Sequence, residues 1–248
     1  MKQRLVNWFR FSSPQAFYRP AGKMIPWFAA AAVSLTAIGL YIGFFVAPTD
    51  AQQGEVYRII FVHVPASWMS MFIYVVMASW AGIGLALNSR LSGMMASALA
   101  PTGAMFAFLS LWTGALWGKP TWGTYWVWDA RLTSELVLFF LYVGFMALQA
   151  AIDDPRRADR AGAVLALVGV VNVPIIYFSV QWWSTLHQGA SVSVTRSPAM
   201  ATTMLTGMLV MALAFWMYAI AVSLARVRAI ILERERHAGW VRELPEAA

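Results

Sequence analysis

The sequence predicts an all-α integral membrane protein with six transmembrane helices. Hydrophobic residues make up 60% of the 248-residue chain and charged residues only 12%, a composition outside the range of soluble globular domains. A spanning helix needs roughly 20 mostly apolar residues, and six segments of this chain reach that length. They are residues 25–47, 59–87, 93–117, 132–152, 160–180 and 202–232.

A basic and aromatic arm, residues 1–24, precedes the first apolar segment. Bulky and charged residues alternate along this arm, which is typical of an amphipathic segment in an anionic headgroup layer on the cytoplasmic side. Pro101 and Pro174 predict kinks in the third and fifth segments. Small residues recur at four-residue spacing from Ala78 and from Gly162, a pattern that lets helices approach closely. These ridges either hold the bundle together or dock another subunit.

The positive charges predict that both chain ends face the cytoplasm, because cytoplasmic flanks collect Lys and Arg. Fourteen of the eighteen Lys and Arg residues fall on the side of the termini, which includes a cytoplasmic tail at 233–248. The external side carries two functional loops, 118–131 and 181–200, and the remaining four cations. The net charge of +7 therefore reflects topology in a single domain, residues 1–248, and not nucleic-acid binding. The external cations are Arg58, Lys119, Arg131 and Arg196.

The first of these external loops, with the residue before it, is unusually rich in aromatic side chains. Interfacial anchoring of a bilayer uses Trp and Tyr singly, so this density predicts a platform for a flat apolar ligand. If residues 122–129 form a helix, Trp122, Trp126 and Asp129 share one face, and the loop is an amphipathic element lying on the external surface. The aromatic residues are Trp117, Trp122, Tyr125, Trp126 and Trp128.

Two of the three histidines, His63 and His187, lie on the external side, whereas His237 is in the cytoplasmic tail. Each histidine alone is more often a satisfied polar residue than a ligand. The chain has no cysteine, and two histidines without a carboxylate or thiolate nearby make a poor zinc or non-haem iron site. Two neutral imidazoles do supply the axial ligation that haem iron accepts.

Haem also accounts for the rest of the external face, because it is a flat apolar disc with two carboxylates at one edge. The external cations are candidates to bind these carboxylates through charge-assisted hydrogen bonds. Alternatively, each cation is solvated or paired with a nearby acidic residue, namely Asp50, Glu55 or Asp129.

Residues 117–129, WGKPTWGTYWVWD, resemble the WWD signature of haem-handling membrane proteins. The segments 61–66 (FVHVPA), 131–135 (RLTSE) and 182–188 (WWSTLHQ) are similar to the CcmC branch, the haem exporter or haem-delivery proteins of cytochrome c maturation. The resemblance covers nearly the whole chain.

The resemblance implies a multi-pass protein of the bacterial inner membrane with its haem site on the periplasmic side. It implies transient, non-covalent binding of haem b between His63 and His187, with the tryptophans and Asp129 in the platform. It also implies delivery of haem to the periplasmic chaperone CcmE, in association with the ABC-type subunits CcmA and CcmB and the small membrane protein CcmD.

Two other functions are compatible with the residues. A cytochrome b-type electron-transfer subunit is also ligated by two histidines, but it normally places both on spanning helices. A permease for haem or a small solute needs a polar pathway, and the interior offers little beyond Glu135, Gln149 and Asn172. Catalytic motifs are missing, which favours a delivery subunit over a classical enzyme. The sequence leaves open whether the protein promotes covalent attachment of haem to its partner.

Overall fold

The computed structural model describes residues 12–183, 185–187, 192 and 200–244. Within these residues it contains six helical segments that are long and apolar enough to cross a membrane. The expected all-helical fold is therefore confirmed. The segments are Pro14–Val46, Glu55–Leu87, Arg90–Trp122, Ala130–Ala151, Pro155–Trp182 and Thr202–Arg234.

Most of the observed helical segments are longer than the predicted ones, and the added residues lie at their ends. The first span is α1, which one turn of π-helix continues, and the second is α2 with a 3-10 turn before it. The fifth is divided into α5 and α6, and a short α8 follows the last span. In order, the elements are α1 Pro14–Tyr41, π-turn Ile42–Val46, 3-10 turn Glu55–Ile59, α2 Ile60–Leu87, α3 Arg90–Trp122, α4 Ala130–Ala151, α5 Pro155–Gly169, α6 Asn172–Trp182, α7 Thr202–Arg234 and α8 Gly239–Arg242.

The predicted headgroup arm is helical where it is described. Helix α1 begins at Pro14, and Ser13 caps it by accepting a hydrogen bond from the Ala16 amide over 3.2 Å. Residues 14–24 of the arm are thus continuous with the first span, and residues 1–11 lie outside the described residues.

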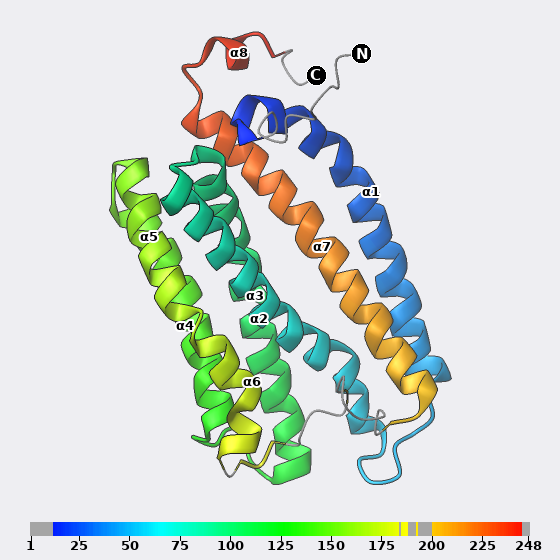
Figure 1. Ribbon diagram of the computed structural model, residues 1–248. Coiled ribbons are helices and arrows are strands. Elements are labelled where there is room, and N and C mark those ends of the chain that lie inside the picture. The colour runs from blue at the N-terminus through cyan, green and yellow to red at the C-terminus, as the bar shows by residue number, and fades with distance from the viewer. Residues whose placement is uncertain (1–11, 184, 188–191, 193–199, 245–248) are drawn as a thin grey trace, which may run out of the picture.

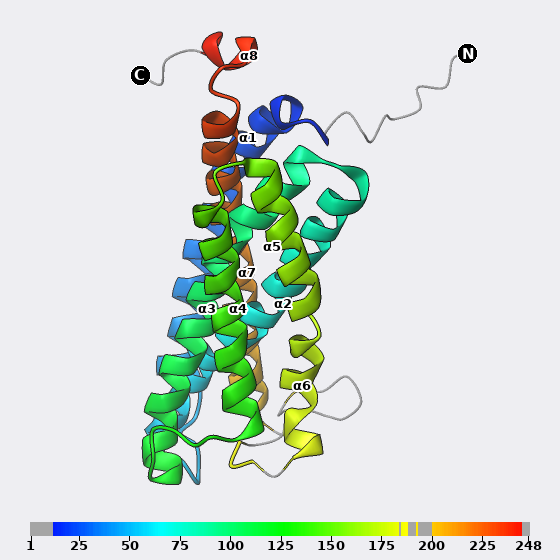
Figure 2. The ribbon, with the colours of Figure 1, turned by 90° about the vertical axis from the view of Figure 1, so that its left-hand side faces the viewer.

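The helices form a bundle in which α2 and α3 pack against each other at the centre (Figure 1). Helix α7 lies beside α1 along one edge, whereas α4, α5 and α6 form the opposite edge. The start of α1 and the short α8 lie at one end of the bundle (Figure 2). The loops 47–54 and 123–129 and residues 185–187 lie at the other end, which we call the site end.

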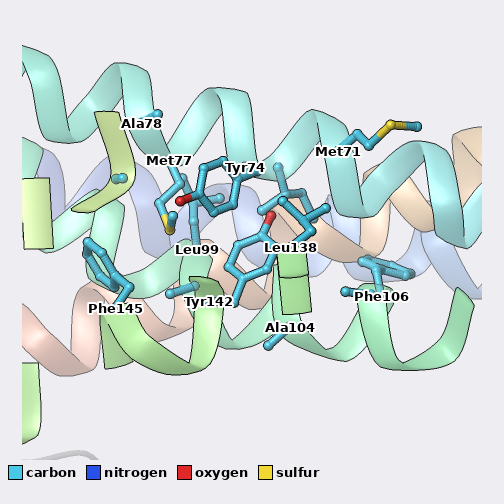
Figure 3. Close-up of a cluster of buried hydrophobic side chains, with 14 of the residues drawn as sticks. Met71, Tyr74, Met77, Ala78, Leu99, Ala104, Phe106, Leu138, Tyr142 and Phe145 are labelled. Carbon is cyan, nitrogen blue, oxygen red and sulfur yellow. The ribbon is translucent and has the colours of Figure 1, made fainter. Parts of the chain in front are cut away.

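Two tyrosines occupy the centre of the buried core. Tyr74 of α2 and Tyr142 of α4 are fully buried, with ring centroids 5.0 Å apart (Figure 3). Tyr142 also donates a hydrogen bond to the Ser70 carbonyl over 2.7 Å. A Cβ added at Gly103 of α3 would collide with the Tyr142 ring. Close packing and interhelical hydrogen bonds of this kind hold helices together in lipid, where apolar burial alone gives little.

The two prolines singled out in the sequence behave differently. Helix α3 continues without a break through Pro101. The fifth span is interrupted at Val170 and Val171, just before Pro174. The break has a local cause, because a proline ring clashes with the carbonyl four residues earlier, here that of Val170, and proline cannot donate a hydrogen bond.

Candidate functional site

A cavity opens at the site end between α2, α3, α4, α6 and α7. It contains about 1340 Å³ of empty space, including the part open to solvent. Six of the residues singled out from the sequence line it together. They are His63, Trp117, Trp122, Trp126, Arg131 and His187.

Helix α2 places His63 one turn from its start, where the side chain is only 8% exposed. Its Nδ1 lies 3.1 Å from the Ser110 carbonyl and 3.0 Å from Thr113 Oγ1, both on α3. The Thr113 hydroxyl donates its hydrogen bond to the Leu109 carbonyl over 2.6 Å. Both oxygens that contact His63 Nδ1 therefore act as acceptors. This pattern assigns the ring proton to Nδ1 and leaves the lone pair on Nε2. Metal-binding histidines show the same arrangement.

Glycine at position 114 gives this ring its space. A Cβ added at Gly114 would lie 3.0 Å from His63 Cε1, closer than side chains normally pack. Helix α3 thus contributes both the polar contacts that orient the His63 ring and the gap into which the ring fits.

The imidazole of His187 faces that of His63 across the cavity. The ring centroids are 6.4 Å apart and the ring planes differ by 36°. An imidazole nitrogen binds a metal at about 2.0–2.1 Å, so two rings on opposite sides of one ion have centres roughly 6.5 Å apart. The observed separation of 6.4 Å is close to this value.

Asp129 determines where the His187 segment lies. Its carboxylate caps α4, with Oδ1 accepting a hydrogen bond from the Leu132 amide over 2.8 Å. Its other oxygen accepts a hydrogen bond from the Thr185 hydroxyl, and Thr185 Oγ1 in turn accepts one from the His187 amide over 3.1 Å. Asp129 does not line the cavity, so it acts by holding α4 and the His187 segment together.

The helix considered for residues 122–129 does not form. Helix α3 runs through Trp122 and ends at Gly123, whose φ of +79° suits glycine, and residues 123–129 are not helical. Trp122 and Trp126 nevertheless both reach the cavity. Asp129 explains the difference, because its side chain caps the next helix instead of continuing the previous one.

The tryptophans fall into two groups. Trp117, Trp122 and Trp126 line the cavity. Trp117 meets the His63 ring edge-on at 5.6 Å and donates to Gln53 Oε1 over 2.7 Å, and the Trp122 ring lies 6.1 Å from that of His187. Trp128 packs on Trp126 at 5.3 Å but is 77% exposed. Tyr125 is also exposed and lies outside the cavity wall.

Of the external cations that the structure describes, only Arg131 lines the cavity. Its guanidinium donates to the Ile176 carbonyl over 2.7 Å and to Ser67 Oγ over 3.0 Å. Arg58 lies outside the cavity wall, where it pairs with Glu55 and donates to the Gly43 carbonyl at the end of the first span. Pairing with an acidic residue was the alternative considered for Arg58. Lys119 is not part of the wall.

Lys119 donates to the Gly123 carbonyl over 3.1 Å and lies over the Tyr125 ring. Arg196 lies outside the described residues.

Sequence reasoning missed part of the cavity wall, notably Gln53, Ser67, Trp68, Ser110 and Glu135. Glu135 was noticed only as a rare polar residue of the interior. Its position one turn after Arg131 in an apolar helix was the available signal, because residues four apart share a helix face. The others carried no sequence signal that separates them from ordinary packing residues.

Fold and site together define a class: a six-helix, multi-pass membrane protein with an aromatic cavity at one end and two facing imidazoles in it. Within the described residues no cluster of three or more His, Cys, Asp or Glu is present that resembles a conventional metal site.

Comparison with known proteins identifies the family. The family model described as "Heme exporter protein C" matches residues 7–242. Heme exporter protein C of Escherichia coli K12 is 48% identical over 232 residues, which is 93% of each chain. That of Bradyrhizobium diazoefficiens is 51% identical over 90% of this chain and 84% of the relative. That of Haemophilus influenzae is 43% identical over 95% and 96%. The chain belongs to the heme exporter protein C family of cytochrome c biogenesis and haem transport.

Proposed function

We propose that this protein binds haem in the cavity at the site end, with His63 and His187 as the axial ligands of the iron. The observation that carries the proposal is the 6.4 Å separation of the two imidazole rings. The contacts of His63 Nδ1 with α3 support it further, because they occupy Nδ1 and leave Nε2 as the nitrogen for the iron. Ligation by two nitrogens fills both axial positions and so restrains reactions of the iron with oxygen.

The remaining cavity residues suit the rest of the haem molecule. Trp117, Trp122 and Trp126 offer indole surface to the apolar macrocycle. Arg131 offers a guanidinium to a haem carboxylate, a pairing that is strong because both partners are charged. Haem is held without a covalent bond in this arrangement, as expected for cargo that is passed on.

The direction of delivery follows from the charge distribution. The positive-inside rule places the termini in the cytoplasm, and so places the site end at the periplasmic face of the bacterial inner membrane. Haem b is delivered there to the chaperone CcmE, with CcmA, CcmB and CcmD as companion subunits. Trp128 and Tyr125 are exposed aromatic residues of the loop 123–129, and we expect them to contact the chaperone or lipid. This protein acts as a delivery subunit.

Absorption spectra of purified histidine variants test the ligand assignment. Wild-type protein expressed with ample haem is expected to show a six-coordinate, low-spin spectrum. His63→Ala and His187→Ala are each expected to lose that signature and to retain less haem, because one axial ligand is missing. His237→Ala is the matched control, since this exposed histidine contacts Arg236 in the tail beyond α7. Unchanged spectra and haem content in both site variants would refute the assignment.

A further inference from the structure

Four polar side chains connect α2 and α4 by hydrogen bonds, and three of them, Ser67, Arg131 and Glu135, line the cavity. Ser67 and Ser70 lie one turn apart on α2, and Arg131 and Glu135 lie one turn apart on α4. Arg131 Nη2 donates to Ser67 Oγ over 3.0 Å, and Ser70 Oγ lies 2.7 Å from Glu135 Oε1. The two serines thus fix a guanidinium and a carboxyl group on one face of α4.

Glu135 is unusual among these four side chains because half of its carboxyl group has no partner. The side chain is 4% exposed and lines the cavity, and its Oε2 has no hydrogen-bond partner among the described residues. An ionisable side chain buried in a spanning helix is energetically costly, so its presence points to a function. None of the contacts proposed above between haem and the cavity involves this carboxyl group.

Arg131 is the matching positive group. Its guanidinium donates hydrogen bonds to the Ile176 carbonyl and to Ser67 Oγ, and within the described part of the chain it forms no ion pair. Glu135 is the acidic residue that lines the same cavity on the same helix, one turn further along. The two charges interact through a poorly hydrated region, where electrostatic effects are stronger than in water.

We propose that Glu135 is the resident counter-charge of Arg131, with which a carboxylate of the bound haem competes. The inference rests on the proposed haem site. An incoming carboxylate gains the attraction of Arg131 but is repelled by Glu135, so the guanidinium holds it less tightly than an isolated arginine would. Glu135 is therefore a positioning residue that keeps the cargo releasable, and it acts only on ligands that carry a carboxylate.

Haem dissociation from the full-length purified protein tests this role. Glu135→Gln retains the size of the side chain and a partner for Ser70 but removes the charge. Transfer of haem from this variant to an excess of a haem-scavenging protein is expected to be about tenfold slower than from wild type. With the dimethyl ester of haem, whose carboxylates are neutralised, wild type and variant are expected to release the ligand at the same rate.

Ser70→Ala is the matched control, because it removes the hydrogen bond to Glu135 and leaves the charge in place. It is expected not to slow the release of haem. If Glu135→Gln does not accumulate in the membrane, Glu135→Met fills a similar volume without a charge and carries the same expectation.

The outcomes separate this inference from the proposed function. Equal or faster release of haem from the Glu135 variant, or the same slowing with the dimethyl ester, would overturn the role of Glu135 alone. A wild-type protein that binds no haem would overturn the haem site itself, and with it this inference.

Discussion

Replacing Asp129 with alanine separates a positioning role from a contact with haem. The structure gives this carboxylate two partners, the amide at the start of α4 and the Thr185 hydroxyl. Thr185 and Asp129 are not in the cavity wall, whereas Leu132 is. We therefore expect Asp129→Ala to weaken the ligation of the iron by His187 and to leave its ligation by His63 unchanged.

The size of the effect follows from the two hydrogen bonds. Loss of a helix N-cap costs about 1 kcal/mol, and a hydrogen bond to a charged group contributes about 1.5–3 kcal/mol. Asp129 and Thr185 are both partly exposed, so solvent screening favours the lower figure. About 1.4 kcal/mol is a factor of ten, so the affinity for haem is expected to fall about tenfold.

The assay combines haem titration with absorption spectroscopy of the iron. Asp129→Ala is expected to show a mixture of six-coordinate haem and haem that has lost His187. The control is Asp154→Ala, because Asp154 caps α5 in the same way, accepting from the Arg157 amide over 2.8 Å, outside the cavity wall. Equal loss of haem in both variants would show that general helix stability is responsible, and would refute the positioning role.

Three further predictions concern the cavity wall. Gly114→Ala places a Cβ 3.0 Å from the His63 ring, and its absorption spectrum is expected to show weakened axial ligation. Arg131→Gln is expected to lower retention of haem but not of its dimethyl ester, whereas Arg58→Gln is expected to lower Tm only, because Arg58 ties the 3-10 turn to the first span. Trp126→Ala is expected to reduce the haem content of the purified protein. Trp128→Ala is expected to retain haem but to transfer it more slowly to the chaperone, which a transfer assay measures. Equal behaviour within either pair would contradict the division between cavity and surface.

The spans were predictable because a bilayer imposes a minimum length and an apolar composition on any helix that crosses it. Their ends were less predictable, because hydrophobicity does not report where a helix stops. Residues 118–122 (GKPTW) extend α3 beyond the predicted segment, and Gly123 and Asp129 cap the helices on either side of the loop. That local chemistry explains why the helix considered for 122–129 is absent.

The candidate site was predictable as far as its residue types carried a signal. Paired histidines and clustered tryptophans indicated a planar ligand, and the structure brings His63, His187 and three tryptophans to one cavity. The different roles of Arg58 and Arg131 could not be predicted, because the sequence shows both only as arginines on the external side. Only the fold shows that Arg58 reaches the first span and that Arg131 faces the cavity.

A structure of the protein with haem bound tests the central proposal most directly. We expect the iron between His63 Nε2 and His187, at about 2.0–2.1 Å from a nitrogen of each ring, with a haem carboxylate at Arg131. Iron bound to any other side chain, or haem lying outside this cavity, would contradict it.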